Sequence, residues 1–184
     1  MNILIVKLNA IGDVLFATPL LEACREIWPE SACDWLIARH AEPILRGHPS
    51  LRQRIVYEGP WGGTGLASLI AYRRMLLRLR EEDYDLVFCL HRNFAAQLLV
   101  ASTQARQRVG FRGALSRLTM THEVTFEDTI HETERYLNLL RGLGHEVANP
   151  GMRIGLTHEA QVTAELLLQE AALPEPLLAI APGG

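Results

Sequence analysis

The chain has 184 residues, of which 48% are hydrophobic and 21% charged, and its formal net charge is −3. A chain of this length and apolar content can bury a core, which excludes intrinsic disorder, and its small net charge argues against a general nucleic-acid binder. Its three cysteines, Cys24, Cys33 and Cys89, are too widely spaced for a zinc motif or a disulfide framework and are typical of a reduced cytosolic protein.

Apolar runs predict β-strands at residues 3–8, 32–37, 54–57, 86–90, 107–111 and 177–181. Helical patterns predict helices at residues 13–28, 41–46, 67–82, 94–102, 132–143 and 158–172. We expect Pro19 to kink or restart the first helix, and Gly144 to end the fifth. The apolar side of the third helix is predicted to contain Leu69, Met75, Leu76 and Leu79.

This alternation of strands and helices predicts an α/β fold, with a Rossmann-like, doubly wound and mostly parallel sheet. The apolar run 177–181 followed by Pro182-Gly183-Gly184 is typical of a strand that opens a new unit. We therefore expect a Rossmann-like domain in residues 1–155. Residues 156–184 would then be a linker helix and the first strand of a truncated second domain, so the native chain would continue.

The N-terminus favours a cytoplasmic location. Lys7 and Asp13 interrupt its apolar run too early for a signal peptide or a membrane span. If the protein acts at a membrane, we expect it to do so from the surface.

The segment KLNAIGDVL, residues 7–15, is the strongest candidate for a functional site. It follows the first strand, whose carboxyl end borders the ligand-binding crevice of a doubly wound sheet. Gly12 would let a ligand approach the backbone, and Asp13 would place a carboxylate at the rim. The alternative is that Asp13 only caps its own helix or adds charge to its first turn, which stabilises by about 0.5–2 kcal/mol.

A second candidate is a tract that lacks acidic residues. Residues 86–122 contain no Asp or Glu, and their five arginines are Arg92, Arg106, Arg108, Arg112 and Arg117. Guanidinium groups pair bidentately with phosphate and carboxylate, so the tract favours an anionic ligand. The alternative is a solvated surface whose arginines pair with nearby glutamates such as Glu81, Glu82 and Glu123.

Other short motifs are weaker. Asp83-Tyr84-Asp85 spells a metal-binding DxD, but its place before a buried strand favours a turn, and no metal site is implied. Gly62-Gly63-Thr64-Gly65 is neither a dinucleotide fingerprint nor a P-loop. His131-Glu132 lacks the second histidine of a zinc protease motif, and the roles of His131 and of the 59–65 loop stay open.

Four segments together resemble glycosyltransferase family 9, the ADP-heptose:lipopolysaccharide heptosyltransferases and their relatives. They are KLNAIGDVLFATPLL (7–21), LHRNFAAQLL with RVGFRG (90–113), HETERYLNLLRGLG (131–144) and LLAIAPGG (177–184). The resemblance covers the whole chain but only the N-terminal half of a typical member. It implies a GT-B fold, in which two Rossmann-like domains face a cleft.

The resemblance also implies an inverting sugar transfer in which Asp13 is the general base that deprotonates the acceptor hydroxyl. The acceptor would be an anionic lipid-linked glycan of the lipopolysaccharide inner-core type, at the cytoplasmic face of the inner membrane. The donor would be a nucleotide-sugar, ADP-heptose by the resemblance, with no further cofactor. Candidate acceptor-binding residues are Lys7, Asn9, Gly12, Arg92, Arg108, Arg112 and Arg117. Candidate donor-binding residues are Ala10, Gly12, Pro182 and Gly183.

Two other functions stay open at this point. We expect the chain to be inactive without its donor half, so it could instead be a non-catalytic Rossmann-like module that binds a nucleotide or an anionic glycan. An NAD-type dehydrogenase domain is disfavoured, because the glycine fingerprint and the acidic residue after the second strand are absent.

Overall fold

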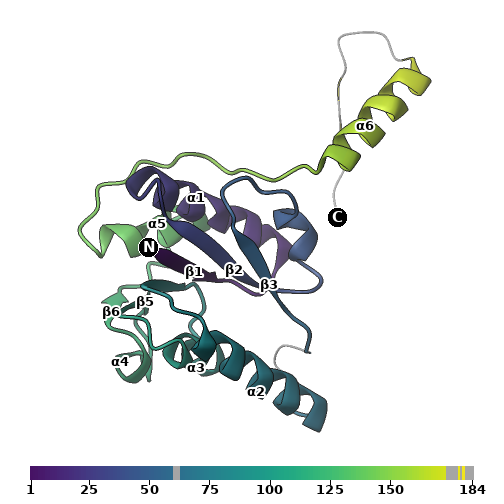
Figure 1. Ribbon diagram of the computed structural model, residues 1–184. Helices are drawn as coiled ribbons and strands as arrows, with labels where there is room; N and C mark the ends of the chain where they lie inside the picture. Colours follow the sequence, from purple (N-terminus) through teal and green to yellow (C-terminus); the bar gives the residue numbers. More distant parts are fainter. Residues whose placement is uncertain (60–62, 173–177, 179, 181–184) are drawn as a thin grey trace.

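The computed structural model describes residues 1–59, 63–172, 178 and 180. Within these residues, six strands form one parallel sheet in the order β3-β2-β1-β4-β5-β6 (Figure 1). The strands are β1 (Asn2–Val6), β2 (Ala32–Ala38), β3 (Gln53–Tyr57), β4 (Leu86–Cys89), β5 (Gln107–Phe111) and β6 (His122–Val124). This confirms the predicted Rossmann-like α/β fold.

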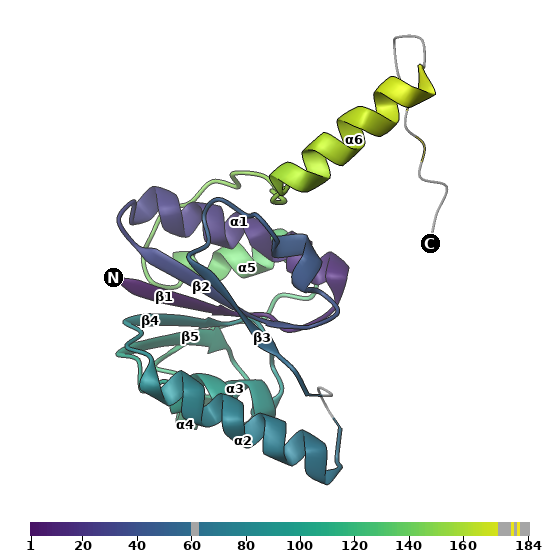
Figure 2. The same cartoon turned by 45° about the vertical axis from the view of Figure 1, so that its right-hand side comes forward.

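Helices cover both faces of the sheet (Figure 2). One face carries α1 (Ile11–Ile27), α5 (Glu132–Arg141) and the 3₁₀ helix η1 (Glu42–Leu45). The other face carries α2 (Leu66–Glu81), α3 (Phe94–Ser102) and α4 (Ser116–Thr119). Because both faces are covered, the central strands are continuous apolar runs rather than alternating ones.

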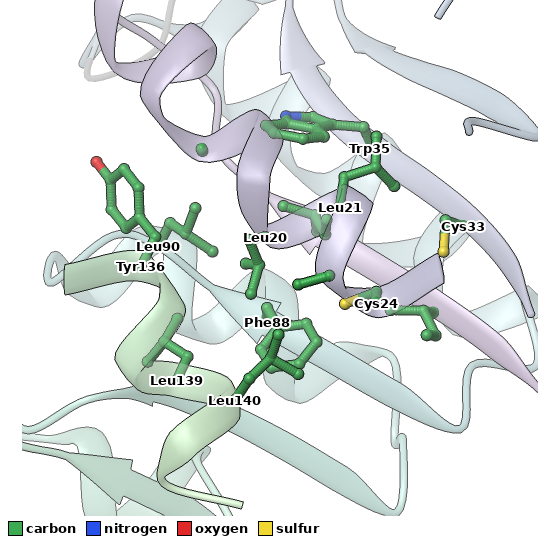
Figure 3. Close-up of a cluster of buried hydrophobic side chains, with 14 of the residues drawn as sticks. Leu20, Leu21, Cys24, Cys33, Trp35, Phe88, Leu90, Tyr136, Leu139 and Leu140 are labelled. Atoms are coloured by element: carbon green, nitrogen blue, oxygen red, sulfur yellow. The ribbon is translucent and has the colours of Figure 1, made fainter. Parts of the chain in front are cut away.

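The larger part of the core lies between the sheet, α1 and α5. Figure 3 shows Leu20 and Leu21 of α1 close to Trp35 of β2, Phe88 of β4 and Leu140 of α5, all of them fully buried. The three cysteines are free and buried. Burial of this apolar area is the main contribution that holds the first βα unit against the sheet.

The first helix differs from its prediction. It begins at Ile11 rather than Asp13, and it continues through Pro19 without a restart. A proline has no N–H to donate to the carbonyl four residues earlier. In α1 the hydroxyl of Thr18 donates instead to the carbonyl oxygen of Leu15, at 2.8 Å, so this carbonyl keeps a partner.

Two other local predictions differ from the structure, and two short elements were missed. Leu69 does not join the buried side of α2, since 63% of it is exposed. The two short elements α4 and β6 were not predicted. The fifth helix ends at Arg141, two residues before its predicted end. Gly144 takes the role expected of it: at φ +91° it closes the last turn, where the His145 N–H donates to the Leu140 carbonyl. The predicted strand 177–181 falls largely outside the described residues.

After α5 the chain crosses back over α1, and residues 151–157 are fixed there. The backbone N–H of Arg153 donates to the Thr18 hydroxyl at 3.1 Å, and the Arg153 guanidinium contacts Glu22 at 3.4 Å. A Cβ added at Gly155 would overlap the backbone of Gly47 and His48, so only glycine allows this close approach.

The last helix, α6 (His158–Ala171), extends away from the sheet, and none of its residues is buried (Figure 1). Among the described residues, none of the helices combines the length and the apolarity needed to cross a bilayer.

Candidate functional site

The candidate site lies where the order of the strands reverses. Strands β1 and β4 are neighbours, but β1 leads into α1 on one face of the sheet and β4 leads into α3 on the other. In a doubly wound sheet, ligands bind at the carboxyl ends of the strands at such a switch point. The chain places residues 7–13 and residues 91–93 there.

Lys7 and Asp13 form an ion pair at this switch point. The Lys7 amine lies 2.8 Å from Oδ2 of Asp13. The Lys7 side chain is 6% exposed and that of Asp13 is 41% exposed, so the lysine is buried beneath a carboxylate that reaches solvent. Asp13 is thus neither turned away from solvent nor used only as a helix cap. The burial of Lys7 suits positioning of Asp13 better than direct contact with an acceptor.

The backbone around Asp13 is open. A Cβ added at Gly12 would meet no atom within 4 Å, and Ala10, the N-cap of α1, provides no side-chain acceptor to the first turn. Asn9, half-buried, lies between Ala10 and the end of β1. A helix N-terminus without a side-chain cap attracts anionic groups through its N–H donors and its dipole. This arrangement could accept a phosphate or a carboxylate beside Asp13.

His91, which was not predicted as a site residue, joins the two halves of the switch point. Its Nε2 accepts a hydrogen bond of 2.9 Å from the backbone N–H of Leu8. Burial, and then the nearby Lys7 ammonium, lower the pKa of His91 to about 3. The ring is therefore neutral at physiological pH, with its proton on Nδ1, and it fixes the loop after β1 to the loop after β4.

The N-terminal half of α5 closes the other side of the ion pair. The Lys7 amine lies 5.4 Å from the ring centroid of Tyr136. Burial, followed by a hydrogen bond with Glu132 and the charge of nearby Asp13, raises the pKa of the Tyr136 hydroxyl, which stays protonated. His131, left open by the sequence, caps α5 through Nδ1 and packs its ring on Phe16.

Two of the predicted arginines lie at the carboxyl edge of the sheet, and a third lies on the short helix that follows β5. Arg92 follows β4, Arg112 follows β5, and Arg117 lies on α4. The guanidinium of Arg92 is 4.4 Å from the ring centroid of Phe126, a contact that orients it while leaving it exposed. Arg117 is 86% exposed, and 3.9 Å separates it from Glu123.

Arg108 does not join this group. It lies near the start of β5, at the amino edge of the sheet, and its guanidinium donates to the backbone carbonyls of Thr119 and Ala105 at 2.8 and 2.6 Å. Because both contacts are internal, Arg108 supports the packing of α4 rather than an acceptor site.

The aspartates of the DxD sequence also lie at the amino edge. Asp85 accepts the backbone N–H of Asn2, and the buried Tyr84 hydroxyl donates to Asp34 at 2.8 Å. Across the described ranges, no three His, Cys, Asp or Glu side chains come together as a metal site would require. Pro182 and Gly183, predicted to bind the donor, fall outside the described residues.

Comparisons with known proteins place this site in context. No family model matches the chain. Lipopolysaccharide heptosyltransferase 3 of Escherichia coli K12 is 28% identical over 138 residues, which are 72% of this chain and 40% of that protein. The structure of a family 9 glycosyltransferase from Veillonella parvula superposes with a TM-score of 0.82 at 24% identity, covering 95% of this chain and 50% of that one. E. coli heptosyltransferase WaaC with ADP-2-deoxy-2-fluoro heptose gives a TM-score of 0.66 at 21% identity, covering 83% and 51%.

The fold is that of one Rossmann-like half of the glycosyltransferase structures that superpose on it. More particularly, the resemblance to the heptosyltransferases of glycosyltransferase family 9 is confirmed. The chain spans less than half the length of the curated relatives it matches.

Proposed function

We propose that this chain is the acceptor-side domain of an inverting, heptosyltransferase-like glycosyltransferase. The complete enzyme would transfer a sugar from a nucleotide-sugar, ADP-heptose by analogy with its relatives, to a lipopolysaccharide inner-core acceptor. Residues 1–155 would form the acceptor-side domain, and residues 156–184 would lead into a donor-binding domain. The protein would work in the cytoplasm, in peripheral contact with the inner membrane.

One observation supports this proposal most strongly: the half-exposed carboxylate of Asp13 at the switch point, held through Oδ2 by the buried amine of Lys7. A sugar hydroxyl becomes a good nucleophile only when a positioned base removes its proton, which contributes about 10²–10⁴-fold to the rate. With Oδ2 bound to Lys7, Oδ1 would take the proton. Lys7 would orient the base and stabilise its negative charge before the reaction.

The acceptor would be held by its anionic groups. Arg92, Arg112 and Arg117 lie at the carboxyl edge of neighbouring parallel strands or on the short helix that follows. Phosphates of the acceptor would pair with these guanidinium groups, and the open N-terminus of α1 at Ala10 and Gly12 would bind a further anionic group. The same turn, through Ala10 and Gly12, would also contact the nucleotide-sugar donor.

The test of catalysis uses the full-length protein that contains this chain. Asp13→Asn keeps the shape of the side chain and removes its basicity, so we expect kcat to fall at least about 100-fold while donor affinity is unchanged. Asp83→Asn, at the opposite edge of the sheet, is the matched control and should keep full activity. Turnover of Asp13→Asn close to wild type would remove Asp13 from the mechanism.

Acceptor binding can be tested on the 184-residue chain itself. Titration with a soluble phosphorylated core oligosaccharide should give an affinity that falls with added salt. Arg92→Gln should weaken binding about tenfold, since hydrogen bonds to charged groups contribute about 1.5–3 kcal/mol each. Arg106→Gln, near the amino edge, should leave the affinity for the oligosaccharide unchanged. Saturable binding of the oligosaccharide by a full-length protein that transfers no sugar would favour a non-catalytic binding module.

A further inference from the structure

Helix α2 has a second apolar stripe, on the side opposite the core. Its inner stripe, which includes Met75 and Leu79, is buried against the sheet. On the opposite side of the helix, Leu66, Ile70 and Leu77 are 73%, 43% and 51% exposed. Their spacing, four and seven residues, places them on one line along the helix. The described chain leaves this line in solvent.

Helix α3, which packs beside α2, and helix α4, which packs beside α3, also expose apolar side chains. On α3, Phe94 and Leu98 are exposed one turn apart, and next to it Leu115 and Leu118 are exposed at α4. The three helices form one layer on the same face of the sheet (Figure 2). We call these seven residues the outer apolar patch; they are Leu66, Ile70, Leu77, Phe94, Leu98, Leu115 and Leu118. A surface of this kind marks an interaction site on a protein.

Two arginines lie beside the α2 part of the outer apolar patch, and Glu123, which contacts Arg117, lies beside its α4 part. Arg73 lies on the same line of α2, and Arg74 follows it. Among the described residues, neither arginine takes part in a salt bridge. The acidic residues between positions 63 and 122 are confined to 81–85, where α2 ends and the chain enters β4 at the amino edge.

Topology places the outer apolar patch beside the candidate site. In parallel βα units each helix starts at the carboxyl edge of the sheet, so the first residues of α2, α3 and α4 lie at the edge that holds Asp13. Leu66 and Phe94 belong to these first turns, and Arg92 precedes Asn93, the N-cap of α3. The apolar first turns of this layer and Arg92 therefore adjoin the switch point, whereas Glu81 and Glu82 at the end of α2 are remote from it.

We propose that the outer apolar patch docks on an anionic lipid bilayer. Leu, Ile and Phe side chains would insert between the headgroups, and Arg73 and Arg74 would pair with lipid phosphates, as in amphipathic helices that lie in the membrane interface. The orientation rests on the proposed function, because it turns the edge with Asp13 toward a lipid-linked acceptor. Bilayer binding itself does not depend on that function.

The 184-residue chain can be sedimented with vesicles made of equal parts phosphatidylglycerol and phosphatidylethanolamine, and with vesicles of phosphatidylcholine alone. We expect binding to the anionic vesicles only, weakened by salt. Arg73→Gln should weaken it about fivefold. Ile70→Ser with Leu77→Ser should weaken it at least about tenfold and leave the salt dependence in place.

Two matched controls lie elsewhere on the molecule. Arg106→Gln removes an exposed arginine near the amino edge, and Leu166→Ser with Leu167→Ser removes two exposed leucines of α6. Both should bind vesicles like the wild type, and circular dichroism should show every variant folded.

Equal binding to both kinds of vesicle, or unchanged binding by the patch variants, would overturn the proposal. So would a dimer that forms without vesicles and is lost in the Ile70 and Leu77 double variant, because the patch would then join two copies of the chain. The assay involves no sugar transfer, so its failure is distinguishable from failure of the proposed activity.

Discussion

His91 offers a quantitative test of the switch-point geometry. Its ring is buried between the loops after β1 and β4, and its pKa is lowered from 6.5 to about 3 by burial and then by Lys7. In the unfolded chain the ring titrates with its ordinary pKa. Between these two values the unfolded chain therefore carries one more proton than the folded protein, and acid favours unfolding.

The expected size follows from the shift. Above pH 6.5 the ring is neutral in both states, and its full contribution to stability is present. Each pH unit below this removes about 1.4 kcal/mol from the free energy of unfolding, so acidification by two units costs about 3 kcal/mol. His91→Gln keeps a side-chain acceptor for the Leu8 N–H and removes the titrating group. The free energy of unfolding of this variant should therefore fall by about 1.4 kcal/mol less per pH unit than that of the wild type.

Urea unfolding of both proteins over this pH range measures the difference. His48, whose pKa burial also lowers, is present in both proteins, so its contribution cancels. Equal slopes for wild type and His91→Gln would refute the reasoning. So would a His91 ring resonance that titrates near its ordinary pKa in NMR spectra of the folded chain.

Two further predictions concern packing. Gly155→Ala should displace residues 151–157, because the new Cβ would overlap Gly47 and His48. We expect faster tryptic cleavage after Arg153 and a stability loss of about 1–3 kcal/mol. The control Gly65→Ala, where a Cβ meets nothing within 4 Å, should change neither the cleavage rate nor the stability. Asp34→Ala should cost about 3 kcal/mol in urea unfolding, because this fully buried carboxylate pairs with Arg52 and accepts the Tyr84 hydroxyl, and a loss below about 1 kcal/mol would contradict that.

The sheet could be predicted from the sequence because its central strands are buried on both faces. The runs that became β1 and β4 are almost wholly apolar, so their position and their parallel pairing followed from hydrophobicity and from the helices between them. The short elements α4 and β6, of four and three residues, are too brief for a periodic pattern to reveal.

The candidate site was predictable only in part. Asp13 follows a strand end, and a doubly wound sheet makes that position a ligand site. The residues that surround the ion pair of Asp13 and Lys7 come from distant segments. Tyr136 lies on α5 and His91 follows β4, and no local sequence pattern brings them together. For Arg108 a signal did exist, since a residue at the start of a predicted strand lies at the edge away from the site.

The hydroxyl of Thr18 performs two tasks that belong to different parts of the protein. It fills the gap that Pro19 leaves in the α1 hydrogen-bond ladder, and it also receives the N–H of Arg153. In Thr18→Val, valine has the same shape as threonine but no hydroxyl, so both hydrogen bonds would be lost. The Leu15 carbonyl of α1 would then lose its donor, and the segment that leads to α6 would lose its contact with α1. Replacement of one oxygen atom by a methyl group would thus affect both parts of the protein.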